Sequence, residues 1–430
     1  MATTSALSDT FPLGSRLNER GRLEVGGCDT IELAREFGTP AYVVAEDDLR
    51  ARARAFLAAG RAAGHDDFHV AFASKAFPCT AVLSLLASDG LWCDVASGGE
   101  LHLALHGGFP PERLVLHGNA KSEAELRMAL RHRVGLIVID NFDELECLER
   151  LLGEGAAGDR GQPVRVRVTP GVRGETNAKI STGQADSKFG FSVADAPLAI
   201  ERAQGADGLL LRGLHAHVGS QILELHPFQR EVEELAALGR GAGGFPIYDL
   251  GGGLGVQYTA EQPAPPSIEE YVTALVRAAA AQGMGQARLL IEPGRALCAN
   301  ACVTLYTVES VKRNVSLWVA VDGGMSDNLR PMLYGAPYEA HVVDRFDGAT
   351  ECVLAGKHCE SSDVLVREAL LDEPRPGDVV VTPATGAYGY AMASNYNGVP
   401  RPPVVFCKDG DARVVVRRER FEDLTDRDVG

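Results

Sequence analysis

Several features that would assign this chain to a specialised class of protein are missing from its 430 residues. No apolar run approaches the roughly 20 residues that a membrane-spanning helix needs. Residues 1–11 have neither the basic start nor the apolar stretch of a secretory signal. The nine cysteines include no CxxC pair, so we expect no metal site and reduced thiols in the cytoplasm.

The chain is also poor in positive charge. Its 42 Lys and Arg residues stand against 58 Asp and Glu residues, which gives a formal net charge of −16. An acidic surface repels phosphate backbones and anionic lipids, so nucleic acid and membranes are poor candidates for partners. A small anionic substrate stays possible, because a pocket can be locally basic. The length predicts two domains rather than one core.

Short apolar runs and helical patterns alternate between residues 68 and 294. Segments such as 100–106, 122–131 and 228–238 repeat apolar residues at helical spacing. The apolar runs between such segments are 68–74, 91–97, 114–118, 136–140, 164–169, 213–219, 245–251 and 289–294. Eight strands that alternate with helices over about 250 residues predict a closed (β/α)8 barrel of the TIM type.

The pattern becomes β-rich after residue 300. Apolar runs separated by turn signals occupy residues 302–311, 316–321, 351–354, 378–382, 404–407 and 412–417. They predict a C-terminal antiparallel β domain. The first 40 residues do not follow the rhythm of the barrel. We therefore expect residues 41–300 to form the barrel, and residues 1–40 and 301–430 to form the β domain.

Polar residues follow the predicted barrel strands, where the reacting groups of such barrels lie. They are Lys75, Asp94, His117 with Asn119, Asp140 with Asn141, Arg167, His217, the triplet Gly251-Gly252-Gly253, and Glu292 with Arg295. Any one of them alone could be a surface or structural group. Their joint occurrence at one end of the barrel predicts an active site.

Three of these features match the needs of pyridoxal 5'-phosphate. Lys75 stands in an apolar setting, where desolvation would favour the neutral amine that forms an imine, although a lysine at a strand end can also be purely structural. Gly252 and Gly253 allow backbone N–H groups to approach an anion, and Arg295 adds a charge for a phosphate. Glu292 could keep the cofactor's ring nitrogen protonated.

Long motifs in a fixed order then point to a family. They are FASKA (72–76), DVASGGEL (94–101), HGNAKS (117–122), KISTGQADSKFGF (179–191), HAHVGSQI (215–222), LGGGLG (250–255), EPGR (292–295), DGGMSDNLRPMLY (322–334), HCESSD (358–363) and GAYGYAMASNYN (386–397). The sequence resembles the alanine-racemase-like, or fold type III, pyridoxal-phosphate decarboxylases, and among them the branch that acts on diaminopimelate. The resemblance covers nearly the whole chain.

The resemblance implies a role for particular residues. Lys75 would carry the cofactor, His217 would stack on its ring, and Glu292 would pair with its ring nitrogen. The other cofactor contacts implied are Asp94, Ser220, Gly252, Gly253, Gly294, Arg295 and Tyr388. Residues implied for the substrate are Arg295, Arg330, Tyr334, Glu360 and Tyr388.

Cys359 has a further implied role, the donation of the proton that replaces carbon dioxide. In the family, Cys359 and Glu360 reach the active site of the neighbouring subunit, so a homodimer is expected. The expected reaction is the decarboxylation of meso-2,6-diaminopimelate to L-lysine. The same chemistry on ornithine, arginine or another amino acid, racemisation, and a non-catalytic cofactor carrier remain the alternatives.

Overall fold

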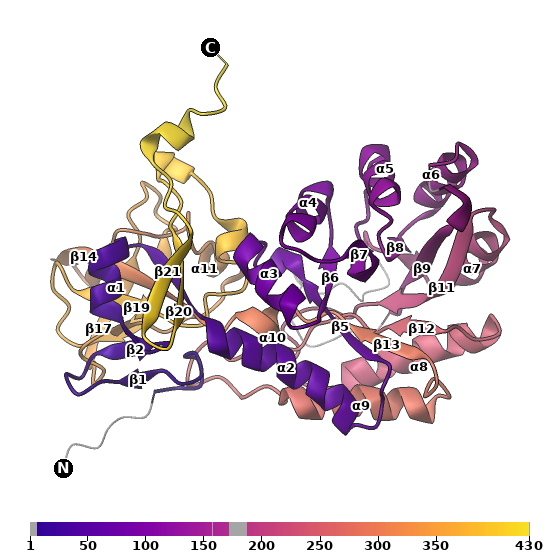
Figure 1. Cartoon of the computed structure of the whole chain (residues 1–430). Helices are drawn as coiled ribbons and strands as arrows, with labels where there is room; N and C mark the ends of the chain where they lie inside the picture. Colours follow the sequence, from indigo (N-terminus) through magenta and orange to yellow (C-terminus); the bar gives the residue numbers. More distant parts are fainter. Residues whose placement is uncertain (1–6, 157, 172–186, 430) are drawn as a thin grey trace. The chain divides into compact units, whose positions relative to one another are not determined.

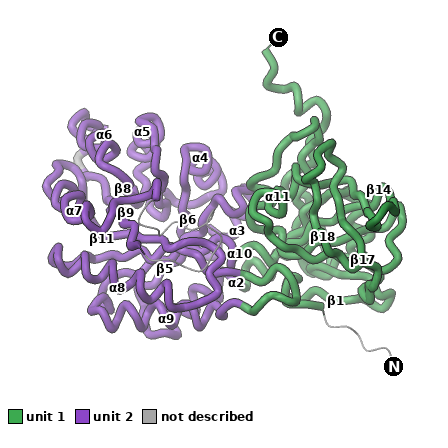
Figure 2. Tube along the Cα trace, turned by 180° about the vertical axis from the view of Figure 1, so that it is seen from behind, with its two compact units in different colours: residues 1–51, 256–264, 297–430 green, residues 52–255, 265–296 purple. Residues whose placement is uncertain are grey.

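The computed structural model describes residues 7–156, 158–171 and 187–429, so most of the predicted motif at 179–191 lies outside the described residues. The chain divides into two compact units, which Figure 2 colours separately. The barrel unit consists of Arg52–Gly255 and Pro265–Ala296, and the β unit consists of Met1–Ala51, Val256–Ala264 and Leu297–Gly430. In the described part of the chain, no helix combines the length and the apolar character needed to span a bilayer.

The barrel unit contains a closed ring of eight parallel strands, as predicted. They are β5 (Phe68–Ala73), β6 (Trp92–Val95), β7 (Leu114–Leu116), β8 (Leu136–Ile139), β9 (Gln162–Thr169), β11 (Leu209–Ala216), β12 (Ile247–Asp249) and β13 (Arg288–Ile291). The ring closes because β13 pairs with β5 and β8 pairs with β9. A short strand, β10 (Phe191–Ser192), runs parallel to β9.

Helices follow the strands and surround them in Figure 1. Along the chain they are α2 (Glu46–Ala62), α3 (Thr80–Ser88), α4 (Gly98–His106), α5 (Glu123–His132), α6 (Phe142–Gly153), α7 (Ala196–Gly205), α8 (His226–Gly241), α9 (Ile268–Ala281) and α10 (Arg295–Cys298). Local sequence fixes several of their starts. Ser122 and Glu125 form a capping box at α5, and Asn141 accepts a hydrogen bond from the Glu144 amide at α6.

The interior of the barrel changes from apolar to polar along the strands. Ala71, Val115, Leu136, Val138 and Leu290 pack together as one buried cluster. Side chains of a strand alternate between its two faces, so a residue two positions further along points the same way. The polar residues two positions after Val115, Val138 and Leu290 are His117, Asp140 and Glu292. The strand period therefore directs these three side chains to the polar end of the barrel interior.

The β unit is built around one long strand, β14. Its main sheet contains β4 (Ala41–Ala45), β14 (Cys302–Arg313), β15 (Leu317–Val321), β17 (Thr350–Ala355), β18 (Val364–Leu371), β19 (Val379–Thr382), β20 (Val404–Lys408) and β21 (Asp411–Val416). Most pairs are antiparallel, as predicted, but β15 with β17 and β20 with β4 are parallel. β4 lies in the range expected for the barrel, yet it pairs with β14 and β20.

Smaller elements complete the β unit. They are β1 (Arg16–Leu17), β2 (Leu23–Val25), β3 (Cys28–Asp29), α1 (Thr30–Phe37), α11 (Arg330–Tyr334) and β16 (His341–Val342). The strands β1, β2 and β3 form a separate antiparallel sheet. Leu23, Val25 and Leu33 from this segment pack with Val303, Val405 and other residues of the main sheet in one hydrophobic core.

Candidate active site

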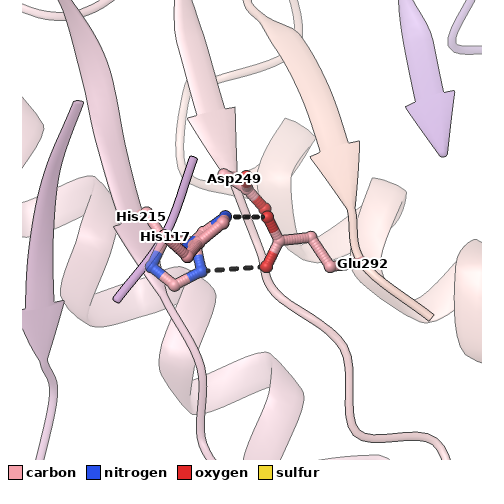
Figure 3. Close-up of side chains that lie close together, drawn as sticks. All are labelled: His117, His215, Asp249 and Glu292. Atoms are coloured by element: carbon pink, nitrogen blue, oxygen red, sulfur yellow. Dashed lines mark hydrogen bonds and ion pairs between the residues drawn. The ribbon is translucent and has the colours of Figure 1, made fainter. Parts of the chain in front are cut away.

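Glu292 lies buried at the end of β13 between two histidines (Figure 3). His117 Nε2 donates to Glu292 Oε1 at 2.6 Å, and His215 Nε2 donates to Glu292 Oε2 at 3.1 Å. Burial alone would raise the pKa of Glu292, but the charges and hydrogen bonds of His117 and His215 hold it well below its usual value. Glu292 is therefore an anion in a site from which water is largely excluded.

Asp249 is the fourth side chain of this cluster and ends β12. Its Oδ1 accepts a hydrogen bond from the Gly251 amide at 3.0 Å, and its Oδ2 forms an ion pair with Arg165. Burial, and next the charge of Glu292, raise the pKa of Asp249 well above its usual value. Arg165 and Asp249 are both fully buried.

The same cluster has the composition of a metal site, because one ligand atom from each of His117, His215, Asp249 and Glu292 lies within 4.8 Å of the others. These atoms are engaged without an ion. Both oxygens of Glu292 accept from histidines, and Asp249 binds Arg165 and the Gly251 amide. Both carboxylates of the cluster are therefore engaged by donors of the protein itself.

Lys75 follows β5 in a short 3-10 helix, η1 (Ser74–Ala76). Its neighbours Ser74 and Ala76 are buried, but the side chain of Lys75 is 50% exposed. The sequence predicts a desolvated amine here, but half of the Lys75 side chain is exposed, because its apolar neighbours bury the backbone and not the whole side chain. Lys75 Nζ lies 3.4 Å from Asp94 Oδ2.

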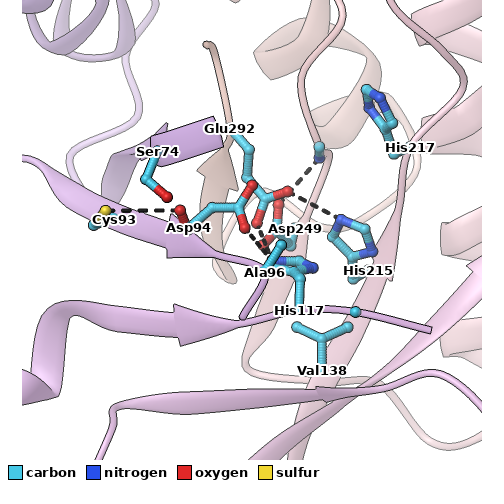
Figure 4. A network of polar contacts seen from close by, with 12 residues as sticks. Ser74, Cys93, Asp94, Ala96, His117, Val138, His215, His217, Asp249 and Glu292 are labelled. Atoms are coloured by element: carbon cyan, nitrogen blue, oxygen red, sulfur yellow. Dashed lines mark hydrogen bonds and ion pairs between the residues drawn. The ribbon is translucent and has the colours of Figure 1, made fainter. Parts of the chain in front are cut away.

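Asp94 connects Lys75 to the Glu292 cluster. It lies buried in β6, and its second oxygen is 3.8 Å from His117 Nε2. Figure 4 shows Asp94, His117, His215 and Asp249 converging on Glu292, with His217 to one side. Lys75 is therefore linked to Glu292 through two intervening side chains.

His217 and the glycine loop after β12 form the other side of the site. The Gly252 amide donates to His217 Nδ1 at 3.2 Å. Burial, and next the positive charge of Lys75, lower the pKa of His217 to about 3, so its ring is neutral. A Cβ on Gly252 would lie 2.2 Å from the carbonyl oxygen of Glu292, and a Cβ on Gly253, which has φ +125°, would lie 2.4 Å from that of Gly219. Only glycine fits both positions.

Arg295 and Ser220 meet beside this loop. Arg295 Nη2 donates to Ser220 Oγ at 2.9 Å, and Arg295 itself is buried. Gly294 packs directly against the segment that carries Lys75, because a Cβ there would lie 3.1 Å from the Cβ atoms of Ala73 and Ala76. The loop residues, Ser220 and Arg295 together provide amide, hydroxyl and guanidinium donors for an anion.

In the β unit, Arg330 begins α11 and is buried among aromatic rings. Its guanidinium carbon lies 4.4 Å from the ring centroid of Tyr258 and 5.6 Å from that of Tyr338, and it donates a hydrogen bond to the Tyr338 hydroxyl. Burial alone would lower the pKa of Arg330, but Tyr258 and Tyr338 raise it. Tyr334, at the other end of α11, is half-buried.

The segment that contains Cys359 and Glu360 is exposed in the β unit and held by backbone contacts. The amide of Cys359 donates to Asn397 Oδ1 at 2.9 Å. Both the amide and the hydroxyl of Ser362 donate to Glu360 Oε1 at 3.3 Å. Tyr388 is half-buried and has a left-handed backbone with φ 64°.

The predicted site residues thus fall into two groups. The barrel unit contains Lys75, Asp94, His217, Ser220, Gly252, Gly253, Glu292, Gly294 and Arg295, and the β unit contains Arg330, Tyr334, Cys359, Glu360 and Tyr388. Sequence reasoning placed His117 at this end of the barrel without a specific role, and it did not single out His215 or Asp249. The spacing of His215 and His217 held a usable signal, because residues two apart in a strand share a face.

A barrel with an amine, a buried carboxylate and an anion cradle at the ends of its strands is the arrangement of a cofactor-dependent enzyme. Residues 47–299 match the family described as pyridoxal-dependent decarboxylase, pyridoxal binding domain, and the chain belongs to this family. It is accordingly an enzyme that uses pyridoxal 5'-phosphate.

Proteins that are similar to this chain over nearly its full length show which pyridoxal-phosphate decarboxylases it resembles. The chain is 46% identical to a diaminopimelate decarboxylase of Actinosynnema pretiosum subsp. auranticum, over 97% of this chain and 95% of the relative. It is 44% identical to that of Bacillus subtilis (strain 168), over 96% and 97%. Its fold matches the crystal structure of diaminopimelate decarboxylase from M. jannaschii in complex with L-lysine, with a TM-score of 0.91, 31% identity and coverage of 99% of both chains.

The described residues fit the family's cofactor. Glu292 is anionic and buried, as a partner of a protonated ring nitrogen must be. The backbone around Gly252 and Gly253 is packed too closely for any side chain, so the main chain itself forms the wall of the site beside Ser220 and Arg295. The side chain of Lys75 is half exposed, with its amine beside Asp94.

Proposed function

We propose that this chain decarboxylates meso-2,6-diaminopimelate to L-lysine and carbon dioxide, with pyridoxal 5'-phosphate as cofactor. The observation that carries the proposal is Glu292, a buried anion held by two histidines in a barrel that also presents Lys75. Full-length relatives at 41% to 46% identity, all named diaminopimelate decarboxylase, support the choice of substrate.

Bound pyridoxal phosphate supplies an electron sink for the pair released when the bond between Cα and a carboxylate breaks. Glu292 would hold the proton of the ring nitrogen in place, since His117 and His215 keep this carboxylate ionised. The neutral ring of His217 suits a stacking role, because it presents a flat face with no charge to repel a cationic ring.

Lys75 would provide the amine that binds the cofactor covalently. Its ion pair with Asp94 keeps the amine close to the barrel interior, and Asp94 can accept a proton when the amine reacts. Ser220, Gly252, Gly253, Gly294 and Arg295 would hold the phosphate, and Tyr388 would assist. Arg295 supplies the positive charge, and the glycine amides supply neutral donors.

Arg330 would bind the carboxylate of diaminopimelate that is retained in the product. Its planar guanidinium matches a carboxylate, and Tyr258 and Tyr338 keep it charged and fixed in a buried position. Tyr334 and Glu360 would contact the same end of the substrate, Glu360 through the amino group. Ornithine and arginine carry no carboxylate there, which makes Arg330 a poor partner for either of them.

The substrate is tested by measuring carbon dioxide release from meso-diaminopimelate, ornithine and arginine, with L-lysine as the co-product of the first. We expect release from diaminopimelate alone. Arg330→Met should lower kcat/KM for diaminopimelate by about 100-fold or more, as loss of a buried charge-assisted contact does. Release from ornithine at a rate unaffected by that change would reject the substrate assignment.

Cys359 would donate the proton that replaces carbon dioxide, and we propose that it does so in the partner subunit of a homodimer. Its exposed position, with the backbone fixed by Asn397, suits a thiol that acts on another chain. Coexpression of Lys75→Ala and Cys359→Ala chains tests this proposal. Random pairing would place one intact site in half of the dimers and restore about a quarter of wild-type activity. No recovery would show that each site belongs to one chain.

We also propose that the enzyme works in the cytoplasm. The nine cysteines all lie in the described residues and form no disulfide, as is usual in a reducing compartment. Localisation of a tagged full chain by cell fractionation checks this point.

A further inference from the structure

Arg165 is a charged residue in the barrel interior that the proposed mechanism does not use. It lies within β9 and is fully buried, and its Nη1 forms an ion pair with Asp249 Oδ2. Its Nε and Nη2 have no hydrogen-bond acceptor among the residues that the structure describes. A guanidinium stays charged even when buried, so its charge acts chiefly on the nearest carboxylates.

Two carboxylates share this neighbourhood. Asp249 and Glu292 each contribute an atom to a cluster in which all ligand atoms lie within 4.8 Å of one another. Like charges this close disfavour each other, and a buried pair without a counter-ion would bind a proton between them. A shared proton would remove the full negative charge that a cationic ring nitrogen requires from Glu292.

Asp249 is also connected to Glu292 through the backbone. Asp249 Oδ1 accepts from the Gly251 amide at 3.0 Å, and the Gly251 carbonyl accepts from the Glu292 amide at 2.6 Å. Gly251 cannot adjust freely, because a Cβ there would lie 2.4 Å from the carbonyl oxygen of Ala216. The Asp249 carboxylate therefore helps to fix the position of the Glu292 backbone through Gly251.

We propose that the buried ion pair of Arg165 and Asp249 is a positioning device for Glu292, which keeps this carboxylate ionised and oriented for the ring nitrogen of pyridoxal phosphate. Arg165 provides a positive charge beside both carboxylates, which opposes the burial and the mutual repulsion that raise the pKa of Asp249. Asp249 transmits the position through Gly251. Neither residue is a catalytic residue, and the inference rests on the proposed role of Glu292.

A double-mutant cycle on cofactor binding tests the proposal. Apoprotein is titrated with pyridoxal phosphate and the dissociation constant is read from absorbance, so diaminopimelate turnover does not enter the measurement. Arg165→Met leaves Asp249 without its counter-ion. Asp249→Asn leaves Arg165 without its counter-ion, so the charge of Arg165 then acts on Glu292. We expect each single variant to weaken cofactor binding by about 10-fold or more.

The double variant R165M/D249N separates charge from packing. It contains no unpaired charge, and the asparagine side chain that replaces Asp249 can still accept from the Gly251 amide through its oxygen, so we expect binding within about three-fold of wild type. If the two residues act only through packing, the losses multiply to about 100-fold, and that result would overturn the proposal. Single variants that bind as wild type does would also overturn it.

Two controls keep the outcome interpretable. Arg165→Lys retains the charge and should bind the cofactor within about three-fold of wild type. This variant keeps the test informative even if Arg165→Met fails to fold. A loss equal to that of Arg165→Met would refute the charge argument. Arg288→Met with Asp67→Asn removes an exposed ion pair of the same barrel, 3.0 Å long, and should leave binding unchanged. Wild-type protein that binds no pyridoxal phosphate would refute the proposed function itself, whereas normal wild-type binding with multiplicative losses would refute only the positioning role.

Discussion

Two networks of charged side chains in the barrel unit use similar contacts in opposite surroundings. One surrounds Glu292 in the barrel interior, where every member is buried. The other lies on the surface of α5, α6 and the residue after α6, and joins Arg127 and Arg150 to Glu123 and Glu154 through four contacts of 2.6 to 2.9 Å. The side chains of this surface network are 39% to 49% exposed.

The comparison shows that contact distance does not set the importance of an ion pair. Water and salt screen the surface network, so removal of one member leaves the others solvated. In the interior, removal of one member leaves a charge that no solvent can compensate. We therefore expect the effects of mutation to follow burial, from Glu292 to Arg150.

The largest effect is expected at Glu292. Glu292→Gln keeps the size of the side chain but removes its charge, so kcat should fall by about 100-fold or more while KM changes little. Steady-state kinetics on diaminopimelate measure this. Glu123→Gln in the surface network is the matched control and should retain full activity, and an equal effect of the two changes would contradict the comparison.

A buried pair outside the predicted site residues should affect stability instead. Lys121 Nζ lies 3.0 Å from Glu144 Oε1 and donates to the carbonyl oxygens of Gly118 and Val138. Burial raises the pKa of Glu144 to about 7 even though Lys121 opposes the shift. Lys121→Met should cost about 3 to 5 kcal/mol of unfolding free energy.

Chemical denaturation measures the effect of Lys121→Met. The loss should be smaller below pH 7, where Glu144 binds a proton and no longer carries an uncompensated charge. A loss that is the same at pH 5 and pH 8 would indicate that packing, and not charge, dominates at this position.

An intermediate effect is expected at Glu339, whose side chain is 14% exposed in the β unit. Burial raises its pKa, but hydrogen bonds from His341, Ser8, Thr10 and the Ala260 amide outweigh burial and lower the pKa to about 2. A lowered pKa stabilises the fold at pH values above 4.5, the usual pKa of a glutamate. This contribution disappears as the pH falls towards 2. Glu339→Gln should therefore be less stable than wild type at pH 6 and equal to it near pH 2, as followed by thermal unfolding. A constant difference would contradict the assignment.

The smallest effect is expected at Arg150. Arg150→Ala should lower Tm by no more than about 2 °C at low salt, and the difference should vanish at high salt. Calorimetry at two salt concentrations checks this. A larger, salt-independent loss would mean that the surface network resembles the buried one.

Sequence reasoning located the barrel well because its strands carry a strong local signal. Each apolar run from residue 68 to 294 ends in or near a polar residue, and all eight predicted strands are present. Two strands of the main sheet of the β unit, one given to the barrel range and one not predicted, lack such a signal. β4 (Ala41–Ala45) is fully buried, so its composition does not distinguish one sheet from another, and β18 (Val364–Leu371) is interrupted by Arg367 and Glu368.

The sequence predicted which residues form the site but not which of them contact one another. Glu292 and His217 followed from their places after strands, whereas the pairing of Glu292 with His215 joins residues 77 positions apart, and that of Arg165 with Asp249 joins residues 84 apart. Such contacts depend on how the strands close into a ring, which local pattern does not encode. The exposure of Lys75 was missed for a related reason, because apolar neighbours in sequence bury the backbone without covering the long side chain.

The central claim is that Lys75 carries the cofactor. Reduction of the purified holoenzyme with borohydride fixes an imine as a stable amine, and peptide mass spectrometry then locates it. The sequence contains seven lysines. We predict the added mass of the reduced cofactor on the peptide that contains Lys75 and its absence from the other six lysines. A cofactor label on a different lysine, or no label on protein that retains decarboxylase activity, would contradict the account.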